Sequence, residues 1–143
     1  MSELKCKLVF DGYWKEKNII NVPEQTGIYC VYTYTINEIN KKQKLTIHKL
    51  IFIGFSENAR TSVLQHETSG EFKKYQGDRQ KICYSFAPLD KIHSEQVKLA
   101  LIISLNPIAN SDVVKKFDYD KTQISTEGQN NLMKSEIILS KNV

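Results

Sequence analysis

The sequence predicts an α/β domain in which a small, mostly antiparallel β-sheet is flanked by helices. Two runs rich in β-branched and aromatic residues, 27–35 and 45–54, are joined by a polar segment and read as a hairpin. A third strand is expected at 81–89, and helix signals begin near residue 56 and at residue 94. The order strand, strand, helix, strand, helix is typical of a sheet with helices packed on it.

The strands differ in how clearly the sequence marks them. Residues 5–10 alternate and predict a short strand, whereas 11–25 reads as irregular because Asp11-Gly12 and Pro23 interrupt it. The run 45–54 has apolar residues at both alternating sets of positions. We therefore expect a central strand covered on both sides, with two apolar sets: Ile47, Ile51 and Ile53 on one face, Leu50 and Phe52 on the other.

Capping residues and prolines limit the helices. Ser56 or Asn58 can cap a helix that runs to about Glu67, and a polar loop then leads to the third strand. The second helix begins at Ser94 and ends before Pro107. Its apolar stripe comprises Val97, Leu101 and Leu105, with Leu99 and Ala100 beside it. The tail, residues 112–143, reads as a hairpin extension of a single domain spanning 1–143.

Composition narrows the class of protein. The chain has 143 residues, of which 41% are hydrophobic and 25% charged, as in ordinary globular domains. No apolar run is long enough for a membrane helix, and the N-terminus lacks the apolar core of a signal peptide. Cys6, Cys30 and Cys83 form no metal pattern and are expected to be reduced, buried thiols of a cytoplasmic protein. The net charge of +4 is compatible with a nucleic-acid partner but does not require one.

Four short motifs follow one another in a specific order. Gly27-Ile28-Tyr29 lies in the first strand of the hairpin, and Phe52-Ile53-Gly54 lies in the second. A capping segment with Ser56 and Asn58 follows, and His66 comes twelve residues after the second glycine. The last motif is LIISLNPIAN, 101–110. Together these motifs resemble those of the GIY-YIG nuclease superfamily, over about residues 26–111.

The resemblance implies a known chemistry, the hydrolysis of a phosphodiester with one divalent cation. In the superfamily a tyrosine hydroxyl helps to activate water, an arginine stabilises charge on the phosphate, and a glutamate holds the metal, usually Mg²⁺. Each role has a physical requirement: a proton acceptor, a fixed positive charge and an anionic oxygen ligand, respectively. An asparagine supports the site.

The resemblance also implies which residue occupies each position in this chain. Three positions are retained, at Tyr29, His66 and Asn110. Three are lost: the second tyrosine is Phe52, the arginine is Ser62 and the metal-binding glutamate is Lys98. The losses remove a hydroxyl, the fixed cation and the metal ligand, and one missing electrostatic stabiliser already costs about 10²–10³ in rate. We therefore expect a domain that is not a working enzyme.

Neighbouring residues offer limited rescue. Arg60 precedes Ser62 by two positions and so lies about 200° round the helix. Glu95 is the better candidate, yet it lies one turn, about 5 Å, before Lys98 and is favoured at a helix N-terminus by the dipole alone. Lys98 is read as a solvated residue or as a phosphate contact. Local structural roles are also open for Tyr29, His66 and Asn110.

Basic residues suggest where nucleic acid could bind. The predicted contacts lie mainly in the loop after the first helix, which also contains Phe72 and Tyr75: Lys73, Lys74, Arg79, Lys81 and, on the helix, Arg60. A second cluster, Lys41, Lys42 and Lys44, lies at the hairpin tip, where the role of 36–45 is open. Such charge runs are more often solvated faces. His48 and His93 are expected at the surface.

These observations lead to one main hypothesis and two alternatives. The main hypothesis is an inactive GIY-YIG-like domain that binds nucleic acid, such as DNA, or a protein partner through the former active-site groove. The first alternative is an active, metal-dependent DNA endonuclease with a rearranged site using Tyr29, His66 and Glu95. The second is an interaction module that binds no nucleic acid. No membrane partner, cofactor or metal is expected, and Mg²⁺ would enter only with an active site.

Overall fold

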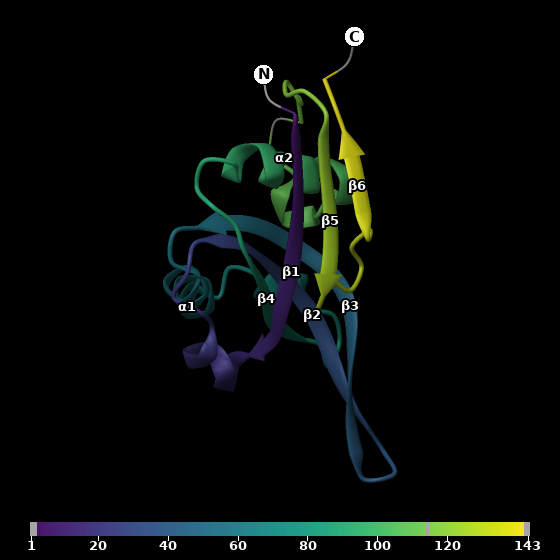
Figure 1. The fold of residues 1–143 in the computed structure, drawn as a ribbon. Helices are drawn as coiled ribbons and strands as arrows, with labels where there is room; N and C mark the ends of the chain where they lie inside the picture. Colours follow the sequence, from purple (N-terminus) through teal and green to yellow (C-terminus); the bar gives the residue numbers. More distant parts are fainter. Residues whose placement is uncertain (1–2, 114, 142–143) are drawn as a thin grey trace.

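The structure, a computed structural model, describes residues 3–113 and 115–141. The described residues form six strands, joined in one sheet, two α-helices and three short 3-10 helices. Figure 1 shows how the sheet and the two α-helices are arranged. The strands are β1 (Leu4–Lys15), β2 (Gly27–Ile39), β3 (Lys42–Ser56), β4 (Lys81–Pro88), β5 (Thr122–Gly128) and β6 (Glu136–Leu139). The helices are η1 (Glu16–Asn21), α1 (Ala59–Ser69), η2 (Lys73–Tyr75), α2 (Ser94–Leu105) and η3 (Ile108–Asn110).

The sheet is mixed, with the strand order β3-β2-β4-β1-β5-β6. Four of the neighbouring pairs are antiparallel, while β1 and β5 run parallel from Leu4↔Thr122 to Phe10↔Gly128. The expected α/β class, with helices flanking a sheet, is therefore confirmed. The C-terminal strands β5 and β6 pair with each other as a hairpin and join the sheet through β1.

Helices cover the sheet on both faces, and each face has its own apolar core. Along β2, Ile28 and Cys30 point to the core that contains α2, whereas Tyr29 and Val31 point to the core that contains α1 and η1. Because a strand alternates its side chains, only a strand covered on both faces can bury successive residues in this way. β2 therefore contributes to both cores, as β3 and β4 also do.

The prediction that residues 45–54 form a central strand is wrong, because β3 is an edge strand. The predicted grouping of its apolar residues is also wrong. Val31 pairs with Phe52 while Tyr32 pairs with Leu50, so Ile51 is an extra residue in a β-bulge. Ile51 and Phe52 consequently lie in the α1 core, and Ile53 lies in the α2 core.

The irregular segment predicted at 11–25 is also partly wrong. β1 continues to Lys15 by pairing with β4 across an irregularity between Gly12 and Trp14, and η1 follows. The pairing overrides the local breaker signal at Asp11-Gly12, because β4 supplies partners for the backbone there.

The helix signals are confirmed in detail. The Asn58 side chain accepts a hydrogen bond from the Thr61 N–H at 3.2 Å, and α1 ends where Gly70 takes a left-handed conformation. α2 begins at Ser94 and ends ahead of Pro107. Within the described part of the chain, no helix is long and apolar enough to cross a membrane.

The three cysteines are free thiols, and two of them are core residues. Cys30 and Cys83 are fully buried, and burial raises the pKa of each thiol to about 12. Cys6 is only partly buried, so the prediction of a buried thiol holds for two of the three. A raised pKa leaves little thiolate near neutral pH, so both core thiols are unreactive packing groups.

Candidate functional site

A groove of about 560 Å³ lies along the edge strand β3 and contains most of the positions identified from the motifs. We call it the edge groove. The residues that line it come from β2, β3, α2 and the segment around η3: Tyr29, Phe52, Ile53, Gly54, Phe55, Glu95, Lys98, Leu99, Ile102, Asn110, Asp112 and Val113. Segments far apart in the sequence thus bring Tyr29, Phe52, Lys98 and Asn110 to one place. Of the other two motif positions, His66 and Ser62 lie on α1 outside this lining.

Gly54 makes room for the Tyr29 ring. The two residues are cross-strand partners in the β2–β3 ladder. A Cβ atom on Gly54 would lie 2.5 Å from Cζ of Tyr29 and 2.6 Å from its hydroxyl oxygen. The glycine of the second motif and the tyrosine of the first are therefore linked sterically, because any side chain at 54 would displace the tyrosine.

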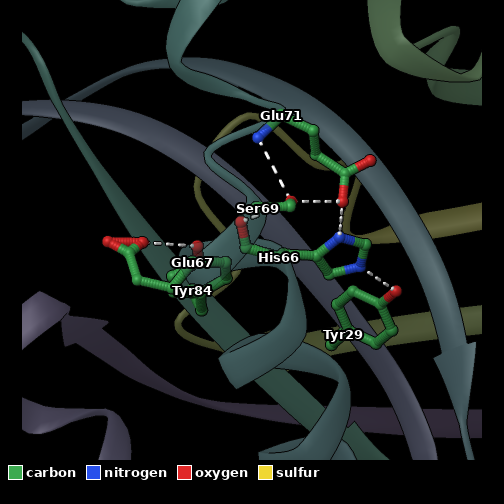
Figure 2. A network of polar contacts seen from close by, with 6 residues as sticks. All are labelled: Tyr29, His66, Glu67, Ser69, Glu71 and Tyr84. Atoms are coloured by element: carbon green, nitrogen blue, oxygen red, sulfur yellow. Dashed lines mark hydrogen bonds and ion pairs between the residues drawn. The ribbon is translucent and has the colours of Figure 1, made fainter.

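A chain of hydrogen bonds runs from Tyr29 to Glu71 (Figure 2). The Tyr29 hydroxyl lies 2.6 Å from Nε2 of His66, and Nδ1 of His66 lies 2.5 Å from Oε1 of Glu71. An ionised carboxylate can only accept, so Nδ1 donates to Glu71, and Nε2 of the neutral imidazole then accepts from the tyrosine. The hydrogen bond from His66 also holds the pKa of the Glu71 carboxyl below its usual value.

Glu71 was missed by the motif comparison because it belongs to none of the motifs. One local signal could have indicated it: Gly70 ends α1 in a left-handed turn, which brings the next residue back towards the helix. Ser69 fixes Glu71 further by donating its hydroxyl to the carboxylate at 3.2 Å and accepting from the Glu71 N–H at 3.3 Å (Figure 2).

Phe52 belongs to an aromatic cluster beside this chain. Its ring centroid lies 5.1 Å from that of Phe72, 5.6 Å from that of His66 and 6.0 Å from that of Tyr29. Phe72 itself is buried, so it is a core residue rather than an exposed surface for bases. The position expected for the second tyrosine therefore contributes packing and contains no hydroxyl.

Asn110 is committed to the backbone of β3. Its Oδ1 accepts from the Ile53 N–H at 2.9 Å, and its Nδ2 donates to the Ile53 carbonyl at 3.0 Å. Both bonds are buried. They satisfy the backbone N–H and carbonyl of Ile53 in β3, the strand at the edge of the sheet, where these groups have no neighbouring strand to bond. Asn110 thus shapes the groove by holding the backbone of β3, which is a local structural role.

The Ser62 hydroxyl forms a hydrogen bond at the start of α1. The Ser56 hydroxyl donates to the Asn58 carbonyl at 2.7 Å, and the Ser62 hydroxyl lies 2.6 Å from Ser56 Oγ. Since the Ser56 proton is used, Ser62 donates to Ser56. The position expected for an arginine therefore supports the start of α1.

Two of the charged groups of the edge groove form an ion pair. Nζ of Lys98 lies 3.3 Å from Oε1 of Glu95, so the ammonium neutralises the acid proposed for a rescued site. Asp112 adds a second carboxylate. Within the described residues, no three His, Cys, Asp or Glu side chains gather closely enough to hold a metal ion. His66 lines a different cavity, so Tyr29, His66 and Glu95 do not surround one common space.

That second cavity, of about 150 Å³, contains part of the predicted basic surface, and we call it the basic cavity. Lys73 and Lys81 line it together with His66, Tyr84 and the acidic residues Glu16 and Glu67. Because the Tyr29–His66 hydrogen bond joins a residue of the edge groove to a residue of the basic cavity, the two spaces lie on either side of it.

The basic residues predicted to contact nucleic acid differ in how accessible they are to a ligand. Arg60 is occupied, since its Nε donates to the Val22 carbonyl at 2.9 Å and its Nη1 pairs with Glu24 at 3.0 Å. Lys74 lies over the Tyr75 ring, 5.3 Å from its centroid, and Arg79 is exposed in a turn. Lys73, Lys74, Arg79 and Lys81 therefore remain accessible to a ligand.

Comparisons of the chain with protein-family models, with curated proteins and with solved structures find no match.

Proposed function

We propose that the protein is a GIY-YIG-like domain that binds nucleic acid through the edge groove without hydrolysing it. One observation carries the proposal. Tyr29, Phe52, Gly54, Lys98 and Asn110, which the motif comparison places at successive positions of one site, line the same groove. A chance match of short motifs would not require residues of β2, β3, α2 and η3 to meet in space.

The side chains at the altered positions support the loss of hydrolysis. Phe52 packs among aromatic rings, and Ser62 is hydrogen-bonded to Ser56. Lys98 places an ammonium group in the groove, where it repels a cation. Each change removes a separate requirement of the reaction, so restoring one of them leaves the others missing.

Binding of a phosphate in the edge groove depends on Lys98, which lies there beside the acids Glu95 and Asp112. Lys98 and Glu95 form an ion pair within a single turn of α2, and the glutamate side chain is 73% exposed. Exposed ion pairs of this kind add only about 0–1 kcal/mol to the free energy of unfolding. A phosphate can therefore compete for Lys98. Lys73 and Lys81 offer two further cations in the basic cavity on the other side of the Tyr29–His66 bond, where Glu16 and Glu67 also lie.

A nuclease assay with a gain-of-function variant tests the proposal. The wild type is compared with the triple variant Phe52→Tyr, Ser62→Arg, Lys98→Glu on plasmid and short-duplex DNA, with and without Mg²⁺ or Mn²⁺. We expect DNA retardation by the wild type at low salt without cleavage, and metal-dependent cleavage by the triple variant only. The triple variant with Tyr29→Phe added is the matched control, and it should be inactive.

Two results would overturn the proposal, and each favours a different alternative. Metal-dependent cleavage by the wild type, abolished by Glu95→Gln, would indicate a rearranged active site. No retardation of DNA or RNA even at low salt would indicate an interaction module, because electrostatic binding is strongest under that condition.

A further inference from the structure

The β2–β3 hairpin continues well beyond the sheet as a two-stranded arm, residues 35–47. β2 pairs with β4 only as far as Tyr34↔Lys81, but it pairs with β3 as far as Ile39↔Lys42. Figure 1 shows this part of the hairpin projecting away from both helices. At about 3.3 Å per residue, the strand from Tyr34 to the turn reaches about 20 Å out of the sheet.

The tip of the arm is a tight turn rather than a loose loop. Asn40 and Lys41, the two residues between the strands, have φ values of 53° and 64°. Two successive left-handed residues form the type of two-residue turn that matches the twist of a hairpin. The arm is therefore a regular twisted ribbon, with a fixed register from Thr35↔Thr46 to the turn.

The charge of the arm is strongly positive near its tip. Lys41, Lys42 and Lys44 are exposed there, and Glu38 is the acid on the opposite strand. None of the three lysines forms an ion pair with another of the residues that the structure describes. Three adjacent cations without acidic partners are complementary to a row of phosphates.

Apolar and basic groups continue the same surface towards the sheet. Ile36 and Ile39 are 39% and 56% exposed. A ribbon that contacted only water would need no apolar side chain at either position. At the base of the arm a groove of about 300 Å³ is lined by Tyr34, Ile36 and Gln43, and by the charged residues Lys15, Glu16, Lys17 and Lys81. This groove and the basic cavity share Lys81 and Glu16, so the arm leads from its basic tip to the basic cavity.

We propose that this arm inserts into the major groove of B-form DNA, with its lysines on the phosphates and Ile39 against base edges. The major groove is about 12 Å wide and 8.5 Å deep, and it admits a two-stranded β-ribbon. The arm is longer than that depth, so it can enter fully. The major groove of A-form RNA is too narrow for side chains to read, so the arm selects DNA over RNA duplexes. This inference rests on the proposed nucleic-acid binding and deepens it.

The first test measures how binding depends on salt. Binding of a fluorescent DNA duplex is followed by anisotropy from about 50 to 200 mM salt for the wild type and for Lys41→Gln, Lys42→Gln, Lys44→Gln. Each lost phosphate contact reduces the slope of log K against log salt by about 0.9, so the triple variant should lose between 2 and 3 units. The matched control, Lys5→Gln, Lys121→Gln, Lys134→Gln, changes the net charge equally on exposed residues outside the arm and should keep the slope.

The second test shortens the arm. Ile36 and Leu45 are cross-strand partners, so replacing residues 37–44 with Asn-Gly restores a two-residue hairpin at a register the chain already uses. Thermal unfolding checks that the core is intact. We expect this variant to lose most of its preference for duplex DNA over single strands.

The outcomes separate this inference from the proposed function. If the wild type binds no nucleic acid, the proposed function fails and the arm has no ligand of this kind. If the wild type binds DNA and both arm variants keep its affinity and salt slope, the inference about the arm is wrong while the proposed function stands. Tighter binding to an RNA duplex of the same sequence would also overturn the placement in the major groove.

Discussion

The hydroxyl of Tyr29 donates to Nε2 of His66 across 2.6 Å, on a line that continues through the imidazole to Glu71. With a neutral imidazole, the tyrosine proton lies in the hydrogen bond to His66, and the phenol oxygen can only accept from a ligand. Burial raises the pKa of the phenol, so Tyr29 stays neutral.

Replacing Tyr29 by phenylalanine should measure the value of this hydrogen bond. The change leaves the ring but removes the donor, so part-buried His66 Nε2 loses its partner. We expect the free energy of unfolding in urea to fall by about 1 kcal/mol. Tyr75→Phe is the matched control, since it removes a hydroxyl that forms no hydrogen bond among the described residues, and it should change little. Equal stability of the two variants would contradict the assignment.

Gly54→Ala should destabilise the protein through Tyr29. The new methyl group would lie 2.5 Å from Cζ of the tyrosine, so the ring must move out of the aromatic cluster. We expect a loss of about 1–3 kcal/mol in the free energy of unfolding. In a Tyr29→Ala background the same change should cost much less, because the clash is gone. A double-mutant cycle measures this coupling, and additive effects would show that the glycine acts independently.

The sequence allowed the local elements to be predicted better than their placement. Strand propensity and the Asn58 cap are local properties, and they were sufficient to locate β2, β3, α1 and α2. The edge position of β3 was not predictable, because both of its faces are covered by the two cores although only one of its edges has a neighbouring strand. The bulge at Ile51 also changes which of its residues share a face. Periodicity assumes a regular strand, and one extra residue exchanges its faces.

The candidate site was predictable only where motifs marked it. Spacing identified Tyr29, Lys98 and Asn110, which line one groove. Glu71 and Asp112 belong to no motif, and their positions depend on how the chain turns after α1 and after η3. Which residues are accessible to a ligand could also be judged only from the structure. Arg60 and Phe72 were candidate contacts in the sequence, but Arg60 is hydrogen-bonded to the Val22 carbonyl and Phe72 is buried.

Asn110→Ala should be more damaging than an average surface change. The asparagine satisfies both the N–H and the carbonyl of Ile53, and the two bonds are buried. Their loss should lower the free energy of unfolding by about 2–3 kcal/mol. Asn37→Ala, an exposed change in the arm, should stay within about 0.5 kcal/mol of the wild type. Faster amide exchange at Ile53, followed by NMR, would locate the effect at the edge of β3.

The Glu71–His66 contact should make a small contribution to stability that depends on pH. The folded-state pKa of Glu71 lies below its ordinary value of 4.5, so the contact stabilises the protein above that pH. The contribution is lost as the pH falls through the lowered folded value, because the protonated carboxyl no longer attracts the imidazole. With the Glu71 side chain 51% exposed, we expect only a few tenths of a kcal/mol.

Urea unfolding of the wild type and of Glu71→Gln from pH 7 to pH 3 checks this contribution. The difference between the two proteins should be largest at neutral pH and vanish under acid conditions. Glu38→Gln, on the exposed arm, removes a carboxylate without a partner in the described structure and should reproduce the wild-type profile. A difference that grows towards low pH would reverse the sign and contradict the contact.

The parallel pairing of β1 with β5 has a consequence for biosynthesis. Leu4 is synthesised 118 residues before its partner Thr122. Until then the outer edge of β1 has no neighbour, although β4 can already occupy its inner edge. Contacts of such long sequence separation form slowly. During synthesis the outer edge of β1 therefore stays open until β5 has been made and can pair with it.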